Sequence, residues 1–497
     1  MKKLNTKIIF YFMGLLLLCN GGFMLLSALI SWIYSDGVTL ELSFTGVLVL
    51  LIGSILMFAT KTHQKEIKKR EGYLIVSLGW LFMTFTGMLP YIFTGAISGV
   101  TNAFFETMSG YTTTGSSILN DIESLPKGVL FWRSTTNWIG GMGFIVLAVA
   151  ILPLLGIGGM QLFAAEAPGP SADKLHPRIT DTAKRLWYIY VGYTAAGTLF
   201  LSLAGMSFFD AINHSMTGIS TGGFSTKNLS MAFWNDTPLI QYISILIMFL
   251  GGTNFVLSYY AFKGKLSRVI RDYEFRFYSL LILGVSLISG LIIWLKAEVP
   301  VSDYHPMVLG EAESAFRHGL FQVVSVITTT GFISADFSNW TPFLTLVFFG
   351  LMFVGGSAGS TSGGVKVVRH LLMIKNGILE FKRALHPNAI IPVRYNGRTI
   401  QEPIIYNILG FFIIYMLVFI VGSLVLGMLG LDFISAVSGA ASALGNIGPG
   451  LGVLNPLASF DVLPGLGKWW LSFLMLLGRL ELFTVLILFT PYFWKRY

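Results

Sequence analysis

The sequence predicts an all-α membrane protein in which four tandem repeats surround a pseudo-four-fold pore, preceded by two extra N-terminal transmembrane helices. Each repeat is a span, a short pore helix and a second span. Three observations predict this fold class. Of the 497 residues, 54% are hydrophobic and only 11% are charged, whereas soluble domains carry about 25% charged residues. Apolar runs of about 20 residues, enough to cross the hydrocarbon core, recur along the chain. A motif rich in Gly, Ser and Thr occurs four times between such runs.

Ten apolar runs are predicted to span the membrane. They cover residues 8–34, 42–60, 73–94, 131–153, 187–206, 239–262, 277–296, 343–374, 404–429 and 469–491. The first run follows three lysines but is too long for the apolar part of a signal peptide, so we expect it to be retained as a span. Four segments between the runs are too apolar for solvated loops, and we expect them to be re-entrant. These segments are 96–125, 207–228, 311–337 and 433–455.

The basic residues gather on one side of this predicted topology. Most of the 33 Lys and Arg residues lie at the two termini and in the loop after every second span. Basic residues mark cytoplasmic loops, so both termini of this multi-pass chain are predicted to be cytoplasmic. This asymmetry also explains the net charge of +9, and no nucleic acid is expected as a partner. The single cysteine, Cys19, excludes an intrachain disulfide and a thiolate metal cluster.

The repeats divide the chain into five predicted parts. Two extra N-terminal helices occupy residues 1–70, and the four pore repeats occupy residues 71–160, 185–265, 272–376 and 400–497. The last helix of the third repeat is predicted to be broken.

Each repeat carries one seven-residue motif that ends in glycine. The four copies are Ser109–Gly115, Thr217–Gly223, Ser325–Gly331 and Ser442–Gly448, and their last glycines are 108, 108 and 117 residues apart. Non-helical main chain at membrane depth must line water or be buried in protein. Glycine permits backbone angles that point successive carbonyls to one side, and rings of carbonyls can replace the water around a cation. Packing of small residues explains one copy, but not four copies in register.

Three further features lie outside the motifs. The run 343–374 is interrupted by a glycine-rich stretch from Gly355 to Gly364, for which a packing kink is the alternative reading. Arg479 lies within the last run, where its charge costs about 2.5 to 3.5 kcal/mol, so it needs a partner in protein or water. A structural ion pair is the alternative there, but Glu481 is two residues away and points elsewhere on a helix. Glu106, aligned with His214, Gln322 and Gly439, is interpreted as a polar contact of the first pore helix.

These motifs, over nearly the whole chain, resemble the Trk/Ktr/HKT superfamily of potassium and sodium transporters. The two extra leading helices resemble the membrane subunit of the bacterial Trk branch. The resemblance implies potassium uptake across the bacterial cytoplasmic (inner) membrane, without enzymatic chemistry. It assigns a K⁺-binding selectivity filter to Thr112, Thr113, Thr114, Gly115, Ser220, Thr221, Gly222, Gly223, Thr328, Thr329, Thr330, Gly331, Gly445, Asn446, Ile447 and Gly448.

The resemblance also implies a gate below the filter. Its residues would be Gly355, Gly356, Ser357, Ala358, Gly359, Ser360, Thr361, Ser362, Gly363 and Gly364, with Arg479 reaching this loop. Gly115 is replaced by serine in sodium-selective plant members, so its presence favours potassium. Asn446 and Ile447 depart from the other copies, which puts strict four-fold geometry in doubt.

The partners implied by the resemblance are a second copy of this chain and a cytosolic nucleotide-binding regulatory subunit of the TrkA type, with the lipid bilayer around the dimer. The sequence has neither a GxxxxGK[ST] loop nor a GxGxxG turn after a strand. We therefore expect no cofactor on this chain, and K⁺ as the bound ion.

Two other functions remain open from the residues alone. A Na⁺- or H⁺-coupled secondary transporter of a small solute also uses broken helices, but it predicts inverted repeats rather than four parallel copies. An intramembrane hydrolase needs a nucleophile paired with a histidine or aspartate. Only His214 and His370 lie near the spans, and neither has a convincing nucleophile partner. Whether permeation is channel-like or ion-coupled also stays open.

Overall fold

The computed structural model describes residues 4–60, 69–143, 179–296 and 307–495. Within these ranges the regular secondary structure is helical apart from one small hairpin, formed by β1 (Arg394–Tyr395) and β2 (Arg398–Thr399). The end of predicted repeat 1, from residue 144 to 160, lies outside the described residues. So does most of the later half of the predicted span 131–153.

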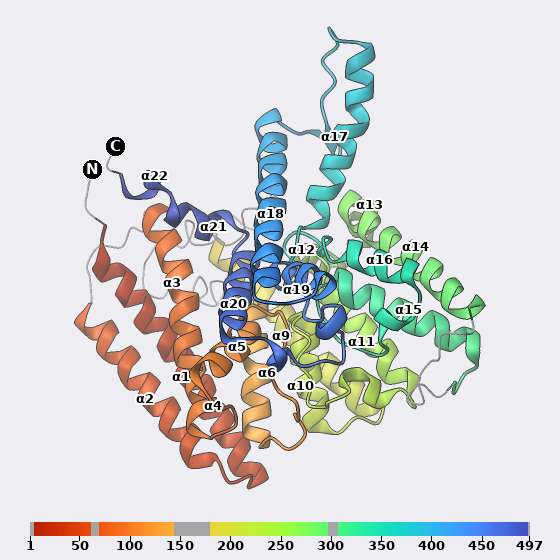
Figure 1. Ribbon diagram of the computed structural model, residues 1–497. Coiled ribbons are helices and arrows are strands. Elements are labelled where there is room, and N and C mark those ends of the chain that lie inside the picture. Colours follow the sequence, from red (N-terminus) through yellow and green to blue (C-terminus); the bar gives the residue numbers. More distant parts are fainter. Residues whose placement is uncertain (1–3, 61–68, 144–178, 297–306, 496–497) are drawn as a thin grey trace.

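Two long helices precede the repeats, as predicted. α1 (Thr6–Tyr34) and α2 (Thr39–Ala59) pack antiparallel at the edge of the molecule (Figure 1). Glycines set their separation: a Cβ built on Gly14 would lie 2.7 Å from the carbonyl oxygen of Gly53, and one built on Gly53 would lie 2.9 Å from that of Gly14. Small residues let membrane helices approach this closely.

Repeats 1 and 2 each begin with a long helix, followed by a short helix and a second spanning segment. Repeat 1 contains α3 (Lys69–Gly87), α4 (Leu89–Phe93), α5 (Val100–Tyr111) and α6 (Lys127–Gly141). Repeat 2 contains α9 (Ile179–Leu203), α10 (Phe208–Ile219), the 3₁₀ turn η1 (Ser230–Trp234), α11 (Pro238–Gly251) and α12 (Phe255–Phe262). α13 (Leu266–Arg271) connects repeat 2 to repeat 3.

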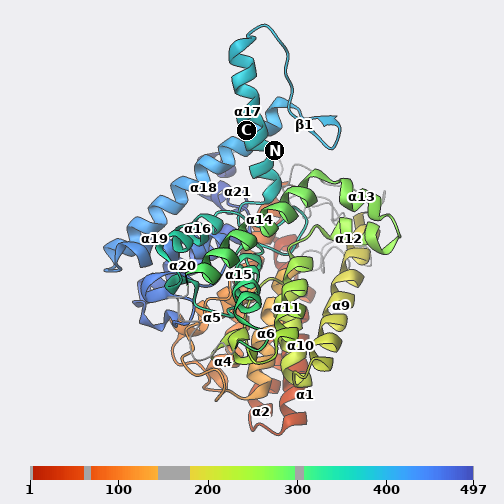
Figure 2. The same cartoon turned by 90° about the vertical axis from the view of Figure 1, so that its right-hand side faces the viewer.

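Repeats 3 and 4 follow the same order. Repeat 3 contains α14 (Tyr273–Leu295), α15 (Glu311–Ile327), η2 (Phe337–Asn339), α16 (Pro342–Leu351) and α17 (Val367–Leu385). Repeat 4 contains α18 (Glu402–Met428), α19 (Phe433–Gly445), η3 (Gly452–Leu454), η4 (Phe460–Val462), α20 (Gly465–Arg479), α21 (Phe483–Leu486), η5 (Ile487–Phe489) and α22 (Pro491–Trp494). α17 and the hairpin project beyond the helical body on the side where both termini lie (Figures 1 and 2).

In the described residues, six helical segments are long and apolar enough to cross a membrane, and two bent helix pairs bring the number to as many as eight. The chain is therefore an integral membrane protein. The predicted spans 239–262 and 469–491 are wrong as single helices, because α11 and α12 meet at 107° and α20 and α21 at 109°. At the first bend, the side chain of Asn254 accepts a hydrogen bond from Val256 N and starts a new helix. At the second bend, Glu481 and Leu482 both have positive φ, 52° and 57°.

The short helices of the four repeats start in two alternating ways. α10 and α19 begin at polar caps, where the side chains of Ser207 and Asp432 accept hydrogen bonds from Asp210 N and Ser435 N. α5 and α15 begin instead after Gly99 and Gly310, whose φ angles of 84° and 98° suit glycine. Repeats 1 and 3 therefore resemble each other locally, as do repeats 2 and 4.

Buried apolar side chains form two large clusters. One joins α1 to repeats 1 and 4 and includes Phe12, Trp80, Phe105 and Leu474. The other joins mainly repeats 2 and 3 and includes Tyr190, Met248, Phe321 and Phe348. The four short helices take part in these clusters, so the packed core holds their carboxyl ends in place.

Candidate functional site

The four short helices end in the same backbone turn. The second residue of each predicted filter segment has a left-handed φ: 53° at Thr113, 55° at Thr221, 56° at Thr329 and 54° at Asn446. The fourth residue is a glycine with positive φ in every case, 83° at Gly115, 70° at Gly223, 77° at Gly331 and 112° at Gly448. Non-glycine residues rarely adopt a positive φ, so four instances in register mark one repeated structure. The fourth copy, despite Asn446 and Ile447, keeps this backbone.

One main-chain hydrogen bond fixes the turn in each copy. The N–H of the sixth motif residue donates to the carbonyl of the first: Thr114 to Ser109 at 2.9 Å, Gly222 to Thr217 at 2.8 Å, Thr330 to Ser325 at 2.8 Å and Ile447 to Ser442 at 3.0 Å. Within one trans peptide the N–H and the C=O point in opposite directions. Because these N–H groups face the helix, the carbonyl of the preceding residue in each copy faces away from it.

The four segments close a ring in chain order. The final glycine of each copy lies against the carbonyl oxygen of the third filter residue in the next copy. A Cβ built on the glycine would lie 2.5 Å from that oxygen for Gly115 and Gly222, 1.9 Å for Gly223 and Thr330, 2.2 Å for Gly331 and Ile447, and 2.7 Å for Gly448 and Thr114. The last contact returns from repeat 4 to repeat 1. The four predicted filter segments therefore surround one centre, and we call this arrangement the ring.

Side chains support the ring unequally. The Thr112 and Thr114 hydroxyls lie 2.8 Å apart, and the equivalent Thr328 and Thr330 hydroxyls lie 2.7 Å apart. In repeat 4, Asn446 Nδ2 donates to Thr114 Oγ1 at 3.0 Å and to the carbonyl oxygen of Met475 at 2.8 Å. The ring is thus four-fold in its backbone, whereas its side chains follow the alternation of the repeats.

The hydroxyl of the first motif residue makes different hydrogen bonds in the four copies. Ser325 donates to the carbonyl oxygen of Phe332, and Ser442 accepts from Gly448 N, so these two hold the segments after their helices. Thr217 donates to the carbonyl oxygen of Asn213 within its own helix. The Ser109 hydroxyl is buried without a hydrogen-bond partner in the part of the chain that the structure describes.

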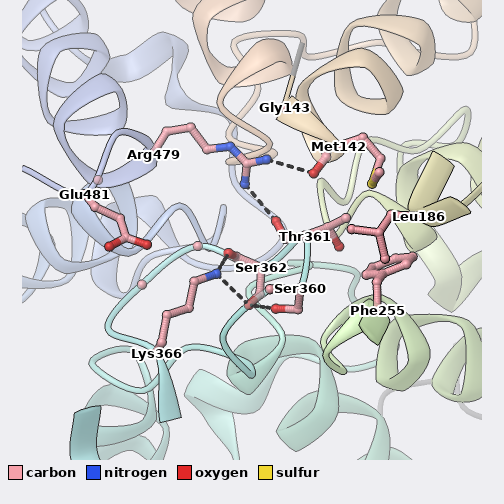
Figure 3. A pocket seen from close by; sticks show the side chains of 15 residues that line it. Met142, Gly143, Leu186, Phe255, Ser360, Thr361, Ser362, Lys366, Arg479 and Glu481 are labelled. Atoms are coloured by element: carbon pink, nitrogen blue, oxygen red, sulfur yellow. Dashed lines mark hydrogen bonds between the residues drawn. The ribbon is translucent and has the colours of Figure 1, made fainter. Parts of the chain in front are cut away.

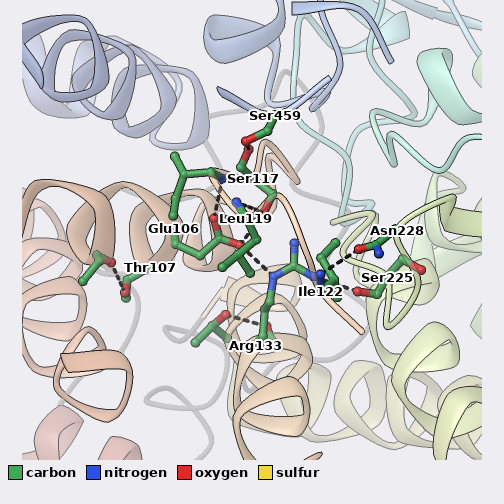
Figure 4. Close-up of polar contacts among 12 residues, drawn as sticks. Glu106, Thr107, Ser117, Leu119, Ile122, Arg133, Ser225, Asn228 and Ser459 are labelled. Carbon is green, nitrogen blue, oxygen red and sulfur yellow. Dashed lines mark hydrogen bonds and ion pairs between the residues drawn. The ribbon is translucent and has the colours of Figure 1, made fainter. Parts of the chain in front are cut away.

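A polar cavity of about 270 Å³ opens at the end of the ring that carries the four final glycines. We call it the outer vestibule. Residues after each filter segment line it, including Ser117, Asn120, Arg133, Lys227, Asn228, Ser230 and Ser459. Figure 4 shows Arg133 reaching from α6 towards Glu106 on one side and Ser225 on the other. The wall of the outer vestibule combines these polar groups with apolar side chains such as Leu119 and Ile333.

The loop that interrupts the third repeat, residues 355–364, lies at the opposite end of the ring. It contacts second filter positions rather than final glycines: Gly363 N donates to Thr329 Oγ1 at 2.7 Å, and Thr221 Oγ1 lies 3.3 Å from Thr361 Oγ1. A Cβ on Gly363 would lie 2.6 Å from the carbonyl oxygen of Gly445. The loop therefore packs directly against three of the four copies.

The same loop fills the bend between α11 and α12. Ser357 N donates to the carbonyl oxygen of Gly252 at 2.9 Å, and Phe255 N donates to that of Gly359 at 3.0 Å. The bend leaves main-chain groups without a partner inside the helix. These hydrogen bonds pair them with main-chain groups of the loop. On the far side, a carboxylate oxygen of Glu274 accepts from Ala358 N at 2.6 Å.

Arg479 joins the loop to the ring. Its guanidinium donates to the carbonyl oxygen of Thr361 at 2.7 Å, to Thr113 Oγ1 at 3.1 Å and to the carbonyl oxygens of Gly140 and Gly141 at the end of α6. Glu481 lies beyond the end of α20, in the bend, rather than on the continuous helix that was expected, and it pairs with Arg369. Figure 3 shows its carboxylate apart from the Arg479 guanidinium.

An inner cavity of about 160 Å³ lies beside these contacts. Loop residues line it together with Arg479, Glu481, Lys366, Leu186 and Phe255 (Figure 3). The Lys366 ammonium donates to the carbonyl oxygen of Ser362, which anchors the end of the loop.

Sequence reasoning missed several groups around the loop. Glu274 stands in the first turn of α14 and its contact is 84 residues away in the chain, so no periodic pattern indicated it. The bends after Gly251 and Arg479 were also not predicted. The run Gly251-Gly-Thr-Asn254 could have indicated the first bend, because two glycines and an asparagine favour a helix end followed by a new cap.

Among the described residues, no three His, Cys, Asp or Glu side chains gather to hold a metal ion. Four parallel copies in rotational order also differ from the inverted repeats that a coupled solute transporter predicts.

Comparisons with known proteins extend these observations. The family model described as TrkH, cation transport protein, matches residues 41–496. The chain is 43% identical to the Trk system potassium uptake protein TrkH of Salmonella typhimurium, over 97% of this chain and 98% of that protein. It is 34% identical to the Trk system potassium uptake protein TrkG of Escherichia coli, over the full length of both.

A solved structure shares the fold. The crystal structure of the potassium transporter TrkH from Vibrio parahaemolyticus matches with a TM-score of 0.87 and 39% identity, over 99% of this chain and 100% of that one. The predicted fold class and the resemblance drawn from the motifs are both confirmed by these matches.

Proposed function

The chain belongs to the TrkH family of cation transport proteins, and from this premise we propose that it carries K⁺ into the bacterial cell across the cytoplasmic membrane. The ring is the proposed selectivity filter. The observation that carries the proposal is the closed cycle of contacts between final glycines and neighbouring carbonyls, from Gly115 through to Gly448. A cation entering this cycle would exchange water for protein oxygen.

The electrostatics of the ring favour a cation. The carboxyl ends of α5, α10, α15 and α19 meet at the ring, and each carries about half a negative charge. No acidic residue is among the sixteen filter positions, so a bound ion would be held without the strong charge that slows its release. Inward movement of K⁺ gains about 2.3 kcal/mol per 100 mV of membrane potential. No covalent chemistry is needed, and K⁺ would be the bound ion.

We further propose that residues 355–364 and Arg479 form the gate. The loop occupies the end of the ring opposite the outer vestibule, and the guanidinium fastens it to the first filter segment through Thr361 and Thr113. A permeating ion would have to pass a peptide loop that carries its own hydrogen bonds to the ring. Opening then requires that these bonds break or shift together.

The proposed assembly is a homodimer regulated by a cytosolic nucleotide-binding subunit. The relatives are named as members of a Trk system, which supports a function with more than one component. α17 begins directly after the gate loop and projects on the side of both termini. Basic side chains such as Lys382 and Arg383 in its last turn fit the cytoplasmic side under the positive-inside rule.

Uptake of Rb⁺, a tracer for K⁺, into liposomes holding the purified chain tests the proposal. We expect Rb⁺ uptake that excess K⁺ suppresses and excess Na⁺ suppresses far less. Gly115→Ser should reduce that difference, because its side chain would crowd the carbonyl oxygen of Gly222. Gly37→Ser is the matched control, since Gly37 has a similar φ of 87° and open space around it. Equal suppression by K⁺ and Na⁺ in the unmodified protein would overturn the proposal.

A further inference from the structure

A buried ion pair stands beside the ring and belongs to neither the filter nor the gate. Glu106 on α5 and Arg133 on α6 meet at 2.7 Å between Oε1 and Nε, and their side chains are 0% and 3% exposed. We propose that this pair is a selectivity-determining positioning element, which holds the chain segments after the first and second filter copies in register. The inference rests on the proposed function and deepens it.

Glu106 occupies a position that is equivalent in the four repeats. We call the hydrogen bond from this part of each pore helix to the segment after the filter a tie. It lies six residues before the first filter residue of its repeat, as do His214, Gln322 and Gly439. The Ser117 hydroxyl donates to Glu106 at 2.9 Å. His214 Nε2 lies 2.9 Å from the Ser225 hydroxyl, and Gln322 Nε2 lies 3.4 Å from the hydroxyl of Ser334. In three repeats the side chain at this position therefore contacts the hydroxyl of a serine that follows the filter segment.

The fourth repeat replaces the tie with a neighbouring residue. Gly439 has no side chain, and a Cβ there would lie 2.8 Å from Leu454. Ser438 takes over, because its hydroxyl accepts from Leu451 N at 2.8 Å. Each repeat thus fastens its pore helix to the segment just beyond its final glycine, and only the first repeat uses a charge.

In the first repeat, the ion pair with Arg133 extends this tie to the second repeat. Glu106 also accepts from Ile118 N at 2.9 Å, so it holds two consecutive residues of repeat 1. Arg133 donates through Nη1 to the carbonyl oxygen of Ser225 at 2.8 Å, and its guanidinium lies 3.6 Å from the ring centroid of Phe224. Phe224 directly follows the final glycine of the second filter copy.

Ser225 is consequently held at both ends. Its carbonyl accepts from Arg133, while its hydroxyl faces His214. His214 Nδ1 lies 2.8 Å from the carbonyl oxygen of Asp210, which can only accept, so Nδ1 carries the proton and Nε2 accepts from Ser225. The two neighbouring segments are therefore connected by one continuous path from Ile118 to Asp210. Figure 4 shows the middle of this path, from Glu106 through Arg133 to Ser225.

The geometry of the ring depends on holding these segments in place, because the contacts between neighbouring filter copies are close. Gly115 lies against the carbonyl of Gly222, where repeat 1 meets repeat 2. The Glu106 and Arg133 pair lies at this same junction, just beyond the filter. A shift of either segment would change the distance between oxygens that a dehydrated ion must contact. Such a shift penalises ions of different radius unequally, which is the physical basis of selectivity.

Two variants separate positioning from charge. Glu106→Gln keeps the side-chain shape but leaves the buried guanidinium uncompensated. Glu106→Gln combined with Arg133→Gln removes both charges and also the bond to Ser225. Glu123→Gln is the matched control, because Glu123 forms an exposed ion pair with Lys227, at 3.4 Å, near the same vestibule.

The readout is the ratio of Rb⁺ to Na⁺ uptake in liposomes, measured with the thermal unfolding of each purified variant. We expect the single and the double variant to lower the ratio about fivefold or more, since a misplacement of about 1 Å can already cost about 100-fold where groups must be accurately positioned. Glu123→Gln should keep the ratio. If Glu106→Gln does not fold, Arg133→Lys carries the test, because it keeps the charge but cannot reach both Glu106 and Ser225.

Two results would overturn the inference. One is an unchanged ratio in Glu106→Gln, or in Arg133→Lys where that variant carries the test. The other is a full return to the unmodified ratio in the double variant, which would mean that charge balance alone matters. Failure of the proposed function is separate, since it would appear as an absence of Rb⁺ uptake in the unmodified protein.

Discussion

Gly223 lies so close to the carbonyl oxygen of Thr330 that a Cβ on this glycine would stand 1.9 Å away from it. This is the tightest of the four contacts that close the ring. Two repeats therefore meet here through main chain alone, and the meeting point tolerates no side chain. The contact makes Gly223 the position where a single carbon would disturb the ring most.

Gly223→Ala is expected to reduce the ratio of Rb⁺ to Na⁺ uptake strongly. The methyl group would push on the backbone of Thr330, which cannot move without moving the ring. Gly95→Ala is the control, because Gly95 has the same φ of 70° and nothing within 4 Å of an added Cβ. Both variants carry the strain of a left-handed alanine, about 1 to 2 kcal/mol. An equal ratio in the two variants would contradict the assigned filter.

Arg479→Gln is expected to raise Rb⁺ flux severalfold in liposomes without any regulatory protein. The substitution removes the charged group that connects Thr361 to Thr113, and hydrogen bonds to charged groups contribute about 1.5 to 3 kcal/mol. The pair between Arg369 and Glu481 stays intact, so the fold should persist. Arg276→Gln, an exposed position on α14, controls for loss of a positive charge. Slower flux at equal folded protein would argue against a gate.

Glu274→Ala is expected to raise basal flux as well, because it frees the loop at Ala358 N. Deleting part of 355–364 should act in the same direction and more strongly. The flux of reconstituted protein measures both effects, and Glu311→Gln on the exposed first turn of α15 is the control for acidic charge. Lower transport by both loop variants, at normal folding, would show that the loop supports permeation rather than restricting it.

Gly14→Ala is expected to lower the melting temperature and leave selectivity unchanged. The added methyl would meet the carbonyl oxygen of Gly53 at 2.7 Å, and overpacking costs about 1 to 3 kcal/mol. Gly22→Ala on the same helix meets nothing within 4 Å, so it should be neutral or stabilising by up to about 1 kcal/mol. Thermal unfolding in detergent compares them. A changed ion ratio in Gly14→Ala would mean that the extra helices influence the ring.

Much of the architecture was predictable because it repeats. The positions of Gly115, Gly223 and Gly331 at equal spacing indicated the four units, and the glycine-rich interruption indicated the loop. Contacts between helices were not predictable, since Glu106 and Arg133 are separated by 27 residues on two different helices. Periodicity describes one face of one helix and carries no information on which helix lies opposite.

The bend between α20 and α21 was missed for a different reason. Glu481 and Leu482 adopt left-handed φ angles that neither residue prefers, so no local propensity indicated the break. The domain boundaries, the roles of the filter and gate residues, the homodimer and the regulatory subunit stay predictions. The predicted end of repeat 1, at residue 160, lies outside the described residues.

The four walls of the ring come from four different stretches of a single polypeptide. An amino-acid substitution therefore alters one of the four copies, whereas in an assembly of identical subunits the same substitution would appear in every copy at once. Asn446 and Ile447 illustrate this freedom, since they stand where the first and third copies carry threonine while the backbone turn is kept. Four repeats within one polypeptide thus let each quarter of the ring acquire its own side chains while the shared backbone turn is kept.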